Sequence, residues 1–177
     1  MNEEKEKNWF LRHAEAEAKK DILPYSDRMG NLAAIVVIVL VTFYFVSHQM
    51  WATGFFTSKF GSLEMVLFYG VLIYQLVPTT LKALFGRKNN ARFFEIFGSV
   101  FATVALAWFL VVFPFDFTYF ADVLPSFLRF LLQWISNDIA KVLMMLGLIV
   151  APIMAVYTAV LYVFVRRELS QSSHKPK

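Results

Sequence analysis

The stretch VLMMLGLIVAPIMAVYTAVLYVFV, residues 142–165, contains no charged side chain. A bilayer core about 30 Å thick is crossed by ~20 apolar helical residues, so this stretch predicts a transmembrane helix. Three further stretches of similar length and character lie at residues 32–50, 63–84 and 94–113. No span has an ionisable group near its centre, where one charge costs ~2.5–3.5 kcal/mol. The chain is therefore expected to cross a membrane four times.

The composition also favours a membrane protein. Of the 177 residues, 58% are hydrophobic and 17% are charged, whereas a soluble domain is roughly 45–50% apolar and about 25% charged. The absence of cysteine excludes a disulfide scaffold and a zinc-finger protein. The basic residues behind the net charge of +4 lie near span ends, which favours contact with anionic lipid and not with nucleic acid.

The distribution of Lys and Arg predicts the orientation. Fourteen of the 17 lie in the first 30 residues, around the link between the second and third spans, or in the tail. The other two links hold three. The positive-inside rule then places both termini in the cytoplasm. The basic residues expected at lipid head groups are Arg87, Lys88, Arg92, Arg166 and Arg167.

The expected fold is all-α, an antiparallel bundle of four transmembrane helices over residues 31–166. Residues 1–30 are expected to form a cytoplasmic amphipathic segment, with a helix over residues 3–20 that ends before Pro24. Residues 167–177 are expected to be a disordered tail, because most of it, SQSSHKPK, is polar.

An extra helix is expected between the third and fourth spans, over residues 126–138. Its apolar side chains recur at helical spacing, namely Phe127, Phe130, Leu131, Trp134 and Ile135. Thirteen residues are too few to cross a bilayer. The pattern predicts an amphipathic helix that lies on the outer leaflet, or a lid packed over the bundle.

Small residues recur every four positions in the last span, at Gly147, Ala151, Ala155 and Ala159, and the third span carries Ser99 and Thr103 at the same spacing. In lipid, small residues let helix backbones approach closely. These stripes are therefore expected to face another helix, either in the same chain or in a second copy.

Two prolines interrupt the apolar spans. A proline has no N–H to donate and its ring crowds the carbonyl four residues earlier. Pro78 is expected to free the carbonyl of Tyr74, and Pro152 to kink the last span.

Polar residues of the spans gather toward the cytoplasmic half. They are Gln75, Thr79, Lys82, Glu95 and Thr158, with Ser99 and Thr103. One interpretation is a small polar cavity or pore entrance closed by a Lys82–Glu95 ion pair. The other is hydrogen bonding between helices, worth about 0.6 kcal/mol per contact.

Sequence motifs give no support for catalysis or for a metal site. The chain has no HExxH, GxSxG, Gly-rich phosphate loop or cysteine pair. His48 is the one histidine within a span, so it is a weak candidate for a haem or pigment ligand and otherwise an interfacial histidine. No cofactor is expected.

Three functions compete on this evidence. The first is a non-catalytic membrane subunit that acts through helix–helix contacts in a homo-oligomer or a larger complex. The second is a small oligomeric channel lined by the polar residues of the inner half. The third is a haem- or pigment-binding membrane protein.

Overall fold

The computed structural model describes residues 9–173 of the chain, and within them the side chains of residues 12–171. This part of the chain is all-helical and forms no named strand. Its elements in order are α1 (Trp9–Lys19), α2 (Tyr25–Met50), α3 (Ser62–Tyr74), α4 (Leu76–Phe85), α5 (Lys88–Val112), the 3-10 helices η1 (Phe117–Tyr119) and η2 (Ser126–Leu131), and α6 (Asn137–Ser173). Four stretches are long and apolar enough to cross a membrane: α2, α3 with α4, α5 and α6.

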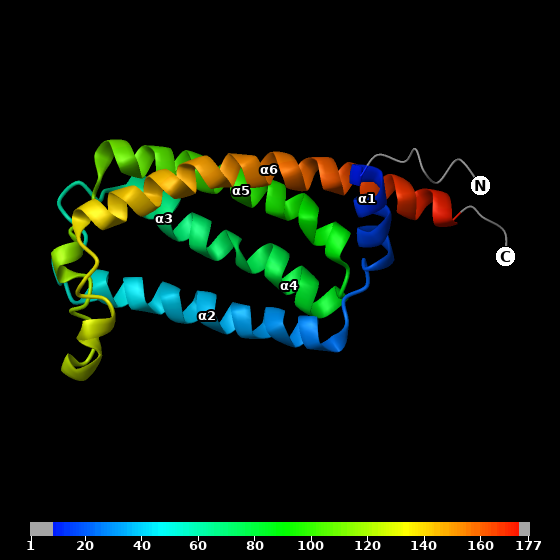
Figure 1. Cartoon of the computed structure of the whole chain (residues 1–177). Helices are drawn as coiled ribbons and strands as arrows, with labels where there is room; N and C mark the ends of the chain where they lie inside the picture. The colour runs from blue at the N-terminus through cyan, green and yellow to red at the C-terminus, as the bar shows by residue number, and fades with distance from the viewer. Residues whose placement is uncertain (1–8, 174–177) are drawn as a thin grey trace.

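The long helices lie side by side, and the remaining segments gather at their two ends (Figure 1). One end holds α1, the α4–α5 turn and the last turns of α6; we call it the terminal end. The other holds residues 51–61 and 113–136, and we call it the loop end. Each end brings together segments that are far apart in the sequence.

The second span is interrupted in its middle. Helix α3 ends at Tyr74 and α4 begins at Leu76, with Gln75 as the joint. Pro78 lies in the first turn of α4, where its missing N–H removes no helical hydrogen bond. The break therefore falls where Pro78 was expected to free the Tyr74 carbonyl. By contrast, α6 continues through Pro152 as one helix.

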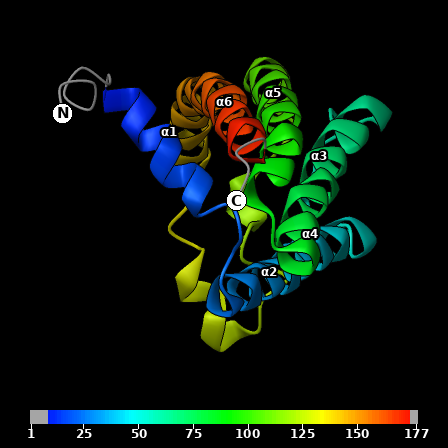
Figure 2. The same ribbon diagram turned by 90° about the vertical axis from the view of Figure 1, so that its right-hand side faces the viewer.

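The most extensive helix contact joins α5 to α6, and α2 packs mainly on α4 (Figure 2). A Cβ added at Gly147 of α6 would come within 3.1 Å of the Leu106 side chain of α5. Ala155, from the same stripe, is buried. At Gly147, the small residue thus serves close packing within the chain, one of the two alternatives that the sequence left open.

At the loop end, the expected α-helix over residues 126–138 is wrong. Residues 126–131 form the short 3-10 helix η2, a turn follows, and α6 begins at Asn137. Arg129 donates hydrogen bonds back to the carbonyls of Leu124 and Asp122. The Ser136 hydroxyl accepts a hydrogen bond from the Ile139 N–H and caps α6. In a continuous helix the Ile139 N–H would donate to the Ile135 carbonyl, so the Ser136 cap marks a new helix start.

Two expected boundaries also shift. Helix α2 begins at Tyr25, inside the segment expected to precede the membrane domain. Helix α6 runs to Ser173, so residues 167–173 are helical and not a disordered tail. The expected helix over residues 3–20 is present as α1 from Trp9 to Lys19, and residues 1–8 and 174–177 lie outside the described part.

The close approach of α5 to α3 gives a first prediction. A Cβ at Gly98 would lie 3.0 Å from the Tyr74 ring, and that ring is tethered because its hydroxyl donates to the Phe94 carbonyl. We expect Gly98→Leu to destabilise the protein by about 1–3 kcal/mol through overpacking. The measurement is the unfolding midpoint in mild detergent. Val100→Leu, at a 51% exposed position of the same helix, is the control, and equal midpoints for the two variants would contradict the prediction.

Candidate functional site

A carboxylate of α1 binds two basic residues of α5 at the terminal end. Glu17 accepts hydrogen bonds from the Nζ of Lys88, at 2.8 Å, and from the Nη2 of Arg92. The Arg92 side chain is only 4% exposed and also donates to Asn89. Burial raises the pKa of the Glu17 carboxyl, but the contacts with Lys88 and Arg92 outweigh it and hold that pKa below its ordinary value. The ionised Glu17 carboxylate therefore holds α1 against α5.

This cluster gives a protein partner to two of the residues expected at lipid head groups. Lys88 and Arg92 were expected at lipid head groups, but both are paired with Glu17. Arg87, Arg166 and Arg167 are exposed. Sequence spacing could not identify Glu17 as the partner, because it lies 75 residues from Arg92 along the chain.

The linker between α1 and α2 holds the α4–α5 turn. The carboxylate of Asp21 accepts from the Asn89 N–H at 2.7 Å, and the Leu23 N–H donates to the Gly86 carbonyl at 2.7 Å. Arg28 donates to the carbonyls of Ala83 and Leu84. These carbonyls belong to the last turn of α4, where backbone carbonyls have no N–H donor within their own helix. The terminal end is thus a continuous polar network.

The expected Lys82–Glu95 ion pair is confirmed and joins α4 to α5. The other polar candidates do not converge on it. The Thr79 hydroxyl donates to the Gln75 carbonyl, and the Thr103 hydroxyl donates to the Ser99 carbonyl, each at 2.7 Å. Both hydroxyls therefore serve their own helices. Thr158 is half-buried, and the Gln75 side chain is exposed with no hydrogen-bond partner among the described residues.

His48 lies at the loop end and is 1% exposed. Its Nδ1 lies 2.6 Å from the Thr53 hydroxyl, and its Nε2 lies 3.1 Å from the Phe120 carbonyl. Because a carbonyl only accepts, Nε2 carries the proton, and both ring nitrogens are engaged. A cofactor bound at His48 would have to break one of these bonds, so the geometry favours a structural role.

The aromatic residues around His48 form a core that the sequence interpretation missed. Phe55, Phe109 and Phe115 are each at most 5% exposed and pack together. The Asp116 N–H donates to the Phe55 carbonyl at 2.7 Å. From the sequence alone, the aromatic residues of positions 108–130 are typical of a membrane–water boundary. The Phe55–Phe56 pair in the link between the first two spans was the available signal that this link packs on residues 113–136.

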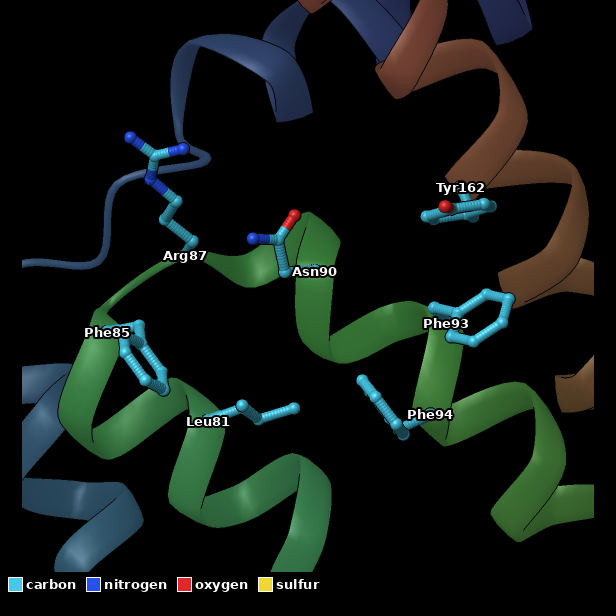
Figure 3. Close-up of a pocket in the computed structure, with 7 residues that line it drawn as sticks. All are labelled: Leu81, Phe85, Arg87, Asn90, Phe93, Phe94 and Tyr162. Carbon is cyan, nitrogen blue, oxygen red and sulfur yellow. The ribbon is translucent and has the colours of Figure 1, made fainter.

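A pocket of about 360 Å³ lies between α4, α5 and α6 near the terminal end (Figure 3). Its apolar lining consists of Leu81, Phe85, Phe93 and Phe94, and its polar lining of Arg87, Asn90 and Tyr162. The Tyr162 hydroxyl accepts a hydrogen bond from Arg166 at 3.0 Å. The pocket is therefore apolar inside and cationic at its rim.

Comparisons of the chain with protein families, curated proteins and solved structures found no match. The site is accordingly assigned from its geometry alone.

Removal of the Glu17 charge tests the α1 attachment. We expect Glu17→Gln to weaken the docking of α1 by about 3 kcal/mol, because it leaves the buried Arg92 without its carboxylate. Hydrogen exchange of the α1 amides in detergent measures this opening. Glu168→Gln removes a carboxylate of α6 that makes no ion pair within the described part of the chain, and it is the control. Equal exchange in the two variants would show that the Glu17 pairs do not hold α1.

Acidification should act on the same attachment. Because the pKa of Glu17 is lowered on folding, its contribution is complete above the ordinary value of 4.5 and is lost as the pH falls through the lowered value. We expect α1 protection, corrected for intrinsic exchange, to fall in that acidic range in the unmodified chain. In Glu17→Gln this fall should be absent, and a fall of equal size there would assign the effect to another group.

Proposed function

We propose that this protein is a non-catalytic integral membrane subunit that acts through helix–helix contacts in a homo-oligomer or a larger membrane complex. In this proposal α2, α3 with α4, α5 and α6 form an antiparallel transmembrane bundle. Both termini lie in the cytoplasm, as the Lys and Arg distribution favours. Two observations support the proposal. One is an exposed polar side chain within a span, and the other is a spanning helix that the rest of the chain hardly buries.

The observation that carries the proposal is Gln75. It is the joint between α3 and α4, in the middle of a span. Its side chain is exposed and has no hydrogen-bond partner in the described part of the chain. An unpaired amide in hydrocarbon costs several kcal/mol. A second helix that offers a polar group would remove that cost, and amides commonly bridge transmembrane helices.

The packing of α2 gives independent support. None of its most apolar stretch is buried within the chain, compared with 17% for both α5 and α6. It packs on α4 and α3 and has no extended contact with α6 among the described residues. This leaves most of one spanning helix available to lipid or to another subunit.

The channel interpretation requires the inner polar side chains to face water. The hydroxyls of Thr79 and Thr103 are bonded to their own helices, and Lys82 is paired with Glu95. These contacts favour the subunit interpretation. In liposomes, the subunit interpretation predicts no flux that depends on Gln75.

The proposal predicts that Gln75→Leu weakens self-association about three-fold, which corresponds to one interhelical hydrogen bond of about 0.6 kcal/mol. Sedimentation equilibrium in a neutral detergent measures the association constant. Gln133→Leu is the matched control, because Gln133 is an exposed amide outside the spans.

Two results would overturn the proposal. One is an unmodified chain that is monomeric and retains no second subunit at a fixed ratio after mild extraction. The other is ion flux through reconstituted liposomes that Gln75→Leu changes, which would establish the channel instead.

A further inference from the structure

The pocket between α4, α5 and α6 has both apolar and polar side chains in its lining. It lies where α4 ends and α5 begins, at Phe85 and Lys88, so in a membrane it would lie at the head-group boundary. Leu81, Phe85, Phe93 and Phe94 line it with Asn90 and Tyr162, and the Arg87 side chain extends outward from its edge (Figure 3). Such a lining matches a ligand with one polar and one apolar part.

The basic side chains near the pocket indicate that the polar part of the ligand is anionic. Around this pocket, Lys82 is paired with Glu95, and Lys88 and Arg92 are paired with Glu17. Arg28 donates to the end of α4. Arg87 is exposed and has no carboxylate partner in the described part of the chain. Arg87 and Arg166, which contacts Tyr162, are therefore two cations near this pocket that no carboxylate of the described residues engages.

Two contacts hold these cations at the rim. The backbone of Arg87 pairs with that of Ile22 in an isolated bridge, which fixes the root of its side chain. Arg166 donates to the Tyr162 hydroxyl, and its guanidinium lies 5.9 Å from the centre of that ring. That guanidinium keeps further N–H donors for a second oxygen.

We propose that this pocket binds an anionic phospholipid, with the phosphate at Arg87 and the glycerol and upper acyl chain against Leu81, Phe85, Phe93 and Phe94. A guanidinium presents two parallel N–H donors to a phosphate, and basic pockets between transmembrane helices bind anionic head groups. A free phosphate would share the contact with Arg87 but leave the apolar lining uncovered. The inference needs the spans to lie in a membrane and is independent of oligomer formation.

The test is native mass spectrometry of the full chain in detergent, titrated with phosphatidylglycerol or phosphatidylcholine. We expect the unmodified chain to retain phosphatidylglycerol preferentially. Arg87→Gln should lower its affinity about five-fold, which is the effect of one cation worth about 1 kcal/mol at a membrane surface. Arg12→Gln, which removes an exposed cation of α1, should lower it less than two-fold.

A second variant tests the pocket without changing the charge. Leu81→Trp should fill the hollow and lower phosphatidylglycerol binding while Arg87 stays in place. Circular dichroism and the unfolding midpoint show whether each variant is folded, and Arg87→Lys should restore part of the affinity if Arg87→Gln acts through charge.

Three results would overturn the proposal. Equal retention of the two lipids would show that the pocket does not select the anion. Equal losses in Arg87→Gln and Arg12→Gln, or no loss in Leu81→Trp, would indicate diffuse attraction to the surface. Displacement of the lipid by millimolar inorganic phosphate would indicate a site for a free anion. Because each readout is lipid retention, a monomeric chain could still satisfy the proposal.

Discussion

Hydrocarbon offers no hydrogen bonds, so each polar group within a membrane span must find its partner in the protein. Four hydroxyl groups of the spans meet this constraint within their own helices. Thr42, Ser47, Thr79 and Thr103 each donate to the carbonyl four residues earlier in their own helix. Such bonds satisfy the hydroxyl without a neighbouring helix. The Gln75 side chain makes no such bond; it lies at the break between α3 and α4 and is exposed.

The same constraint explains why the two ends are built differently. Charged groups that would be costly inside the bilayer gather at the terminal end, where Glu17 pairs with Lys88 and the buried Arg92. At the loop end, two connecting segments bury a phenylalanine core around Phe55 and Phe115, with His48 beside it. Charge-assisted hydrogen bonds dominate the terminal end. Aromatic packing dominates the loop end, although an Arg129–Asp122 ion pair also lies there.

Features that depend on local sequence could be predicted. The four spans follow from apolar length, and the break near Gln75 follows from Pro78. The Lys82–Glu95 pair followed from counting depth along two neighbouring spans. Features that depend on which segments meet could not be derived from the sequence. Nothing in the spacing places Glu17 beside Arg92 or Phe55 beside Phe115, and η2 was mistaken for a longer helix because Ser136 was not recognised as the cap of α6.

The central claim is that four helices cross a membrane and leave both chain ends on the cytoplasmic side. Because the chain has no cysteine, single cysteines can map it without a background. Ala16→Cys and Ser170→Cys probe the terminal end, and Ser58→Cys and Ser126→Cys probe the loop end; all four positions are exposed. In sealed vesicles of known orientation, an impermeant maleimide should label the first pair only from the cytoplasmic face and the second pair only from the opposite face. Labelling of Ala16→Cys and Ser170→Cys from opposite faces would contradict the account.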